Sequence, residues 1–190
     1  MTGDTHFLQK SYHCAALTMA ELEETCFDKT YGLFMGPAVF QDGIAGYDEP
    51  VYDPAKWDDS YALHHPHSDS IRCLSTNAVY YRAYGCLNMM ATVLKEPPAI
   101  SASFLEKSLL LAKNIKQHFY RPDCHRFYYL IDHKGAPHDY QEGLGVAYAL
   151  LFNLVPVDES LEVIENTYVT AHGIPCVYPS FPRNTPDKPS

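Results

Sequence analysis

Two kinds of helical segment alternate along this chain, and the alternation limits the folds that the chain can adopt. Residues 75–95 and 141–154 are apolar on nearly all sides, whereas residues 101–119 and 159–168 carry apolar side chains along one stripe. A helix that is apolar all round is buried on both sides, and a one-sided helix is half solvated. The pattern predicts consecutive helical hairpins packed in an inner and an outer layer, because a simple four-helix bundle would show one-sided stripes throughout.

The one-sided helices are predicted from spacings of three and four residues between apolar side chains. A first amphipathic helix ends at a polar turn over residues 27–32, and residues 126–132 are strand-like with a turn at 133–135. Ser75 or Thr76 is expected to cap the first inner helix. The predicted buried stripes are Leu8, Tyr12, Ala15, Met19, Leu22 and Cys26 in the first helix, and Leu105, Leu109, Ala112, Ile115 and Phe119 in residues 101–119.

Length and charge narrow the class of partner. The 190 residues fit one domain, and the formal net charge of −9 argues against a nucleic acid or an anionic membrane as partner. No apolar run approaches the roughly 20 residues of a membrane-spanning helix. Residues 1–10 lack the layout of a signal peptide. The compartment stays open, because a longer parent chain could be secreted or periplasmic.

Neither the cysteines nor the histidines form a metal-ligand pattern. The six cysteines contain no C-x-x-C pair and several lie on apolar helical faces, so we expect buried free thiols rather than disulfides or a metal site. Adjacent histidines in residues 64–67 point apart, and no second cluster has ligand spacing. Residues 143–145, Gly-Leu-Gly, lack the rest of a nucleotide-binding fingerprint. We therefore predict no metal and no cofactor.

The segment 36–47 combines one carboxylate with a permissive backbone. Asp42 lies between an apolar run and two glycines, which allow a sharp turn and the close approach of a ligand. Tyr47 and Trp57 are among the aromatic residues nearby, as flat apolar side chains surround a bound sugar ring. A carboxyl among aromatic rings is poorly solvated, which raises its pKa and makes it a proton donor at neutral pH. The alternative is a surface turn that uses Asp and Gly for their backbone preferences alone.

A second carboxylate, Glu142, stands where a glycine-rich stretch leads into an inner helix. If the inner helices start on one rim, Asp42 and Glu142 face one pocket, and paired carboxyls across a pocket perform glycoside hydrolysis. The helix dipole alone also favours an acidic residue in a first turn. Arg72 and Asn77 flank the start of the first inner helix, where they can hydrogen-bond sugar hydroxyls or serve as a salt-bridge partner and a cap.

Residues 36–47 and 74–81 together resemble the six-hairpin, (α/α)6-barrel glycosidases. The second segment, Leu-Ser-Thr-Asn-Ala-Val-Tyr-Tyr, is similar to the Asn-Ala-Leu-Tyr inner helix that follows the general-acid loop of trehalases, glucosidases and glycogen-debranching enzymes. The resemblance implies that Asp42 is the general acid, which in trehalases stands in a Ser-Gly-Trp-Asp loop. Residues 141–145 and 173–179 also resemble rim segments of such barrels. The predicted substrate contacts are Tyr47, Trp57, Arg72, Asn77 and Gln141.

The resemblance implies an all-α fold class: a partial (α/α)6 toroid of helical hairpins with long loops and a short β-hairpin. This domain is expected over residues 1–183, with a loose tail at 184–190. A closed toroid needs twelve helices and, at about 1.5 Å per residue, well over roughly 300 residues. The chain is therefore expected to be a fragment or a truncated reading frame without the later hairpin that carries the general base.

The implied function is inverting, exo-type hydrolysis of oligosaccharides, and whether the isolated chain is an enzyme stays open. The alternative is an inactive fragment that binds a sugar or a partner chain, or self-associates through inner helices left exposed by missing hairpins. A third alternative is a lyase or phosphorylase on the same toroid. A lyase for acidic polysaccharides needs a basic cleft, and 14 Lys and Arg against 23 Asp and Glu argue against one.

Overall fold

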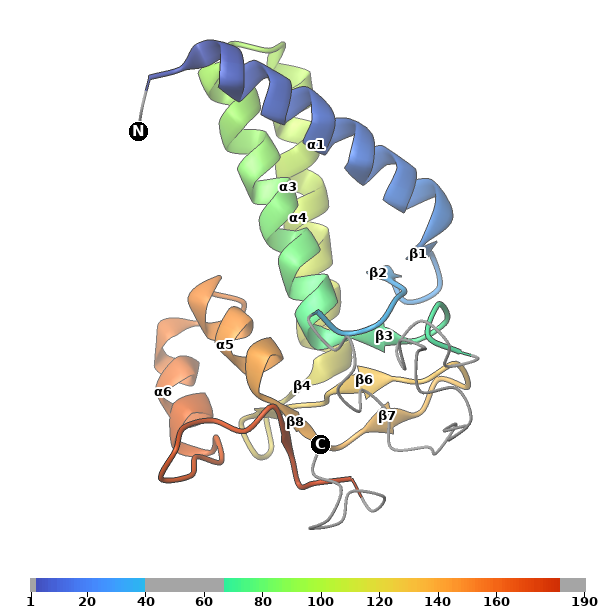
Figure 1. Ribbon diagram of the computed structural model, residues 1–190, viewed down its shortest axis with the longest axis vertical. Coiled ribbons are helices and arrows are strands. Elements are labelled where there is room, and N and C mark those ends of the chain that lie inside the picture. Colours follow the sequence, from blue (N-terminus) through green and yellow to red (C-terminus); the bar gives the residue numbers. More distant parts are fainter. Residues whose placement is uncertain (1–2, 40–66, 182–190) are drawn as a thin grey trace, which may run out of the picture.

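The computed structural model describes residues 3–39 and 67–181, and helices dominate this part of the chain. Figure 1 shows α3 and α4 side by side as a hairpin, α1 leaning across them, and α5 and α6 as a second, lower hairpin. Within the described residues, no helix is long and apolar enough to cross a membrane. The helices are α1 (Thr5–Thr25), α3 (Leu74–Val93), α4 (Pro98–Phe119), α5 (Gly143–Leu151) and α6 (Val157–Glu165).

The first helix and the first inner helix begin in different ways. Asp4 caps α1, because its side-chain Oδ1 accepts a hydrogen bond of 2.9 Å from a backbone N–H in the first turn. The N-cap residue of α3, Cys73, makes no capping hydrogen bond with its side chain. The N–H of Leu74 instead donates to the carbonyl of Tyr129 at 3.1 Å. The predicted cap at Ser75 or Thr76 is therefore wrong, since both residues lie inside the first turn.

Short antiparallel strands close the lower ends of the helices. In the described residues they form a three-stranded sheet, in the order β3 (Arg72–Cys73), β6 (Leu130–Ile131) and β7 (Pro137–His138), and three two-stranded sheets. The two-stranded sheets are β1 (Phe27–Asp28) with β2 (Leu33–Phe34), β4 (Tyr120–Arg121) with β5 (Arg126–Phe127), and β8 (Gln141–Glu142) with β9 (Val177–Tyr178). The fold therefore fits part of a helical toroid. The predicted all-α fold class is incomplete, because it does not include these short sheets.

The strand predicted over residues 126–132 is divided between two sheets. Its first part, β5, pairs with β4, whereas its second part, β6, lies between β3 and β7. The predicted turn at 133–135 is confirmed, because the N–H of Asp132 donates to the carbonyl of Ala136 at 2.9 Å. Gly135 adopts a φ of 87° in this turn, which favours glycine.

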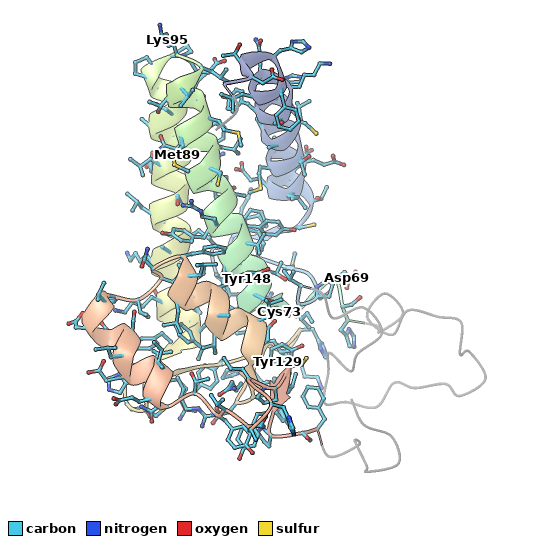
Figure 2. The ribbon with its side chains drawn as sticks, turned by 60° about the vertical axis from the view of Figure 1, so that its left-hand side comes forward. Asp69, Cys73, Met89, Lys95, Tyr129 and Tyr148 are labelled. Atoms are coloured by element: carbon cyan, nitrogen blue, oxygen red, sulfur yellow. The ribbon has the colours of Figure 1, made fainter. Side chains whose placement is uncertain are left out.

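The inner helix α3 is buried all round at its beginning and open on one face further along. Its first five residues, 74–78, are all buried, whereas Met89 is 48% and Val93 is 65% exposed. Figure 1 shows why: α5 lies beside the lower half of α3, and Met89 stands beyond its reach (Figure 2). The prediction of a doubly buried helix therefore holds for the first half of α3 only.

The buried stripe of the first helix is confirmed, and that of α4 is partly wrong. The residues predicted for α1 are all buried or half-buried. In α4, Leu105 and Leu109 are 45% and 62% exposed. The residues that are buried in α4 are Ser108, Leu111, Ile115 and Phe119. Ser108 belongs to this row because its hydroxyl donates to the carbonyl of Tyr81 on α3 at 3.3 Å.

All six cysteines are free, as predicted, but they are not uniformly buried. Cys73 is buried in the core, whereas Cys14 and Cys176 are exposed. In residues 3–39 and 67–181, no group of three or more His, Cys, Asp or Glu side chains is placed to hold a metal ion.

Candidate functional site

The two inner helices α3 and α5 begin beside each other. Glu142 is the last residue of β8 and the N-cap residue of α5. Its Oε2 accepts a hydrogen bond of 3.2 Å from the N–H of Ser75, in the first turn of α3. Figure 2 shows Cys73 at this lower end of α3, next to α5. The prediction that the inner helices start on one rim is confirmed for these two helices, and we call their meeting point, residues 73–77 and 141–145, the rim.

The Glu142 carboxyl is enclosed by the protein. Its side chain is 1% exposed, and its Oε1 has no hydrogen-bond partner in the structure. Burial raises the pKa of this carboxyl to about 7, although the N–H and the hydroxyl of Ser75 both act to lower it. Burial and the charge of Glu142 also raise the pKa of the Cys73 thiol well above its usual range. Near neutral pH the carboxyl can therefore exist in either protonation state.

The glycines after Glu142 are required for close packing. A Cβ at Gly145 would lie 2.5 Å from Glu142 Oε2, and a Cβ at Gly143 would lie 2.5 Å from the carbonyl oxygen of Pro175. Both distances are shorter than real Cβ contacts. The Gly-Leu-Gly stretch therefore lets the start of α5 approach the carboxyl and the chain before β9.

The segment that precedes residue 40 is attached to the same rim. The N–H of Val39 donates to Ser75 Oγ at 3.1 Å, and the hydroxyl of Thr76 donates to the carbonyl of Pro37. Gly36 has a φ of 138°, and its N–H donates to the carbonyl of Ile71 at 2.8 Å. Residues 36–39 are therefore held at the rim by these hydrogen bonds.

Three of the predicted site residues, Asp42, Tyr47 and Trp57, lie outside the described residues, and their roles stay predictions. The other predicted residues, Arg72, Asn77, Gln141 and Glu142, are all buried at or next to the rim.

Arg72 is a salt-bridge partner, which is one of the two roles expected for it. Its guanidinium lies over the ring of Tyr31, with 4.5 Å between the guanidinium carbon and the ring centroid. Nε donates to Asp28 Oδ2 at 2.9 Å, and Nη1 donates to the carbonyls of Ser70 and Asp132 at 3.3 and 3.0 Å. These bonds occupy the guanidinium within the protein, and substrate binding by Arg72 stays a prediction.

The side-chain amides of Asn77 and Gln141 hold neighbouring backbone segments. Asn77 Oδ1 accepts from the N–H of Phe34 at 2.7 Å, and Nδ2 donates to the carbonyl of Phe34 at 3.0 Å. Gln141 binds Tyr168 in the same way, at 2.7 Å through Oε1 and 3.1 Å through Nε2. Each amide thus binds both backbone groups of one residue, as a neighbouring strand does. Asn77 does not cap α3, and contact of either amide with a substrate stays a prediction.

Sequence reasoning missed a hollow of about 450 Å³ between α1, α3 and α4. Its lining includes Ala20, Leu110 and Leu111. Glu23 also lines the hollow, and it hydrogen-bonds two other lining residues. Glu23 Oε1 accepts from the hydroxyl of Tyr84 at 2.5 Å and from Lys107 Nζ at 2.6 Å. In the sequence, Glu23 lies off the apolar stripe of the first helix, and nothing there distinguishes the wall of a hollow from a solvated face. Of the predicted site residues that the structure describes, none lines this hollow.

Comparison with solved structures finds this arrangement of helices in glycosidases of the (α/α)6-barrel type. A GH78 family rhamnosidase of Bacillus sp. GL1 aligns with a TM-score of 0.62 and 15% sequence identity, over 86% of this chain and 15% of that chain. The neutral trehalase Nth1 from Saccharomyces cerevisiae aligns with a TM-score of 0.55 and 13% identity, over 70% of this chain and 26% of that chain.

These similarities are between folds and cover a small part of each neighbour. The chain spans 15% of the length of the rhamnosidase and 26% of the length of the trehalase. No family model matches the sequence, and no curated protein matches it either. A glycosidase-like fold is therefore what the comparisons establish.

Proposed function

We propose that the chain is a glycoside hydrolase-like domain that acts on oligosaccharides by inverting acid and base hydrolysis, with its carbohydrate bound at the rim. The observation that carries the proposal is the shared fold of two glycosidases together with a carboxyl at the rim whose pKa lies near neutrality. A group of this kind can give or take a proton at physiological pH. The rhamnosidase and the trehalase support a sugar as the substrate class.

In this proposal Asp42 is the general acid that donates a proton to the leaving oxygen, while a second carboxyl activates water on the opposite face of the sugar. Asp42 follows Val39 by three residues, so the length of the chain alone keeps their Cα atoms within about 11 Å of each other. Val39 is bonded to Ser75, which is also bonded to Glu142. The full burial of Glu142 favours a supporting role for it over direct activation of water.

The proposal is tested by measuring binding and turnover together. We expect the purified chain to bind sugar, and its hydrolysis of 4-nitrophenyl glycosides is measured in the same preparation. A panel with α-L-rhamnoside and α-D-glucoside covers the sugars of the two neighbours, and saturation-transfer NMR reports binding. Turnover that disappears in Asp42→Asn and persists in Asp69→Asn, a control on an exposed residue, would support Asp42 as the general acid. Absence of both binding and turnover would contradict the proposal.

The alternative is a domain without catalysis that binds a sugar or a partner chain. The observation that favours a partner is the exposure of apolar side chains on the inner helices, 65% for Val93 on α3 and 70% for Leu151 on α5. Self-association through these faces is part of this alternative. Concentration-dependent association in sedimentation velocity, with no sugar binding in the same preparation, would favour it over hydrolysis.

A further inference from the structure

We propose that the hollow between α1, α3 and α4 is a binding site for a neutral, largely apolar molecule that carries one hydroxyl group. The hollow has a volume of about 450 Å³, which suits a small organic molecule. None of the residues that line it within the described structure belongs to the rim. The inference therefore goes beyond the proposed function, and sugar binding at the rim can fail while this site holds, and the reverse.

Apolar side chains from two helices and a strand line the hollow. Figure 1 shows α1 leaning across α3 and α4, with β1 at its lower end. Ala20 of α1, Phe27 of β1, and Leu110 and Leu111 of α4 contribute to the lining. Leu110 is 53% exposed, so a ligand in the hollow can cover it. Removing this apolar surface from water favours binding of an apolar body.

A second hollow, of about 370 Å³, adjoins the first between α1 and α4. The two hollows share Ala20, Glu23 and Lys107, and the second adds Ile100 and Phe104 of α4. Glu23 and Lys107 therefore lie where two apolar spaces meet. A ligand with an extended apolar chain fits this arrangement when its polar group lies beside these two side chains.

The hydrogen bonds of Glu23 leave room for one more polar group. Its Oε1 accepts from the hydroxyl of Tyr84 at 2.5 Å and from Lys107 Nζ at 2.6 Å, and its Oε2 accepts from Lys107 Nζ at 2.7 Å. A carboxylate accepts about four hydrogen bonds, and an ammonium donates three. Among the described residues, one acceptor position of Glu23 and one N–H of Lys107 are therefore left for a ligand. A hydroxyl group matches both, because it donates one hydrogen bond and accepts another.

The charges around the hollow favour a neutral ligand. Two acidic side chains, Glu23 and Glu24, and two lysines, Lys29 and Lys107, line it, so their charges balance near neutral pH. A cationic or anionic head group would lose part of its hydration on entering and would meet no net opposite charge. A hydroxyl loses less hydration and recovers it in hydrogen bonds to Glu23 and Lys107.

The experiment is an NMR titration of the isotope-labelled chain with octanol and three analogues. Dibutyl ether is the isomer of octanol without a hydroxyl, whereas octylamine and octanoate carry a positive and a negative head group. We expect octanol to shift the backbone amides of Ala20, Glu23 and Leu110 with a saturating curve. Dibutyl ether should bind about tenfold more weakly, because it cannot donate to Glu23. Both charged analogues should also bind more weakly than octanol.

Three variants test the position and the chemistry of the site. Ala20→Phe adds a ring at an exposed position that lines both hollows, and it should abolish octanol binding. Leu17→Phe is the matched control on α1, because Leu17 is 58% exposed and lines neither hollow, and it should bind octanol as the wild type does. Lys107→Met removes one positive charge from the lining, so octylamine should then bind more tightly than octanol.

Four results would overturn the inference. The first is the absence of saturating shifts up to the solubility limit of octanol, and the second is an equal affinity for octanol and dibutyl ether. The third is octanol binding that persists in Ala20→Phe, which would place the ligand elsewhere. The fourth is an unchanged preference for octanol over octylamine in Lys107→Met. Should Ala20→Phe fail to fold, the comparison of the four ligands on the wild-type chain still decides the outcome.

Discussion

Replacing Arg72 with methionine is expected to lower the free energy of unfolding by about 3–5 kcal/mol, because it leaves a buried carboxylate without its partner. The side chains of Arg72 and Asp28 are 10% and 12% exposed. Burial alone would raise the pKa of Asp28, but its hydrogen bonds with Arg72 and with the backbone of Thr30 hold the pKa below its usual value. Without Arg72 the buried carboxyl must either keep its charge unpaired or take up a proton, and either state makes the folded protein less stable than the paired one. Urea denaturation followed by circular dichroism measures the loss.

An arginine with a more exposed partner and a double variant are the controls for Arg72. Arg121 pairs with Asp139, whose side chain is 51% exposed, so Arg121→Met should cost less than about 1 kcal/mol. Combining Arg72→Met with Asp28→Leu should recover much of the loss, because no unpaired charge stays buried. An effect of Arg72→Met no larger than that of Arg121→Met would show that the Arg72 pair does not organise β1, β3 and β6.

Replacing Glu142 with glutamine is expected to remove a pH-dependent loss of stability. The pKa of Glu142 is raised from 4.5 to about 7 in the folded protein, which corresponds to about 3 kcal/mol. The unfolded chain loses this proton first, so the wild-type protein loses stability as the pH rises from about 4.5 to about 7, and the loss is constant above that. The stability of Glu142→Gln relative to the wild type should therefore increase by about 3 kcal/mol between pH 4.5 and 8.

Glu159 provides a control with the opposite sign. Its hydrogen bond from Lys116, at 2.8 Å, lowers the pKa of Glu159 despite partial burial. Its contribution is present above its unfolded pKa and is lost as the pH falls, so Glu159→Gln should destabilise the protein at neutral pH and less so in acid. Urea titrations of both variants across this pH range measure the two trends. A stability difference for Glu142→Gln that does not change with pH would show that the carboxyl is solvated.

The layered helices were predictable because burial leaves a periodic mark in a sequence. The stripe of α1 and the buried beginning of α3 follow from spacings of three and four residues. In α4 the same rule failed, since Leu109, Leu110 and Leu111 allow more than one apolar row. The row of α4 that packs on α3 includes Ser108. The burial of Ser108 depends on its hydrogen bond to the carbonyl of Tyr81 on α3.

The rim was predictable in its position and less so in its contacts. The sequence placed Glu142 where a glycine-rich stretch leads into an inner helix, and the structure places Gly145 of this stretch against Glu142. The partners of Asn77 and Gln141 are backbone groups 43 and 27 residues away in the sequence. A sequence pattern does not encode such pairs, because any residue type supplies the same N–H and C=O.

The most direct test of the central claim is to map where a sugar binds on the labelled chain. Titration with the best ligand of the glycoside panel should shift the backbone amides of residues 36, 38, 39, 74–77 and 141–145. The variant Trp57→Ala should bind the ligand more weakly. Shifts that gather instead around Ala20, Tyr84 and Leu110, in the hollow between α1 and α4, would contradict a carbohydrate site at the rim.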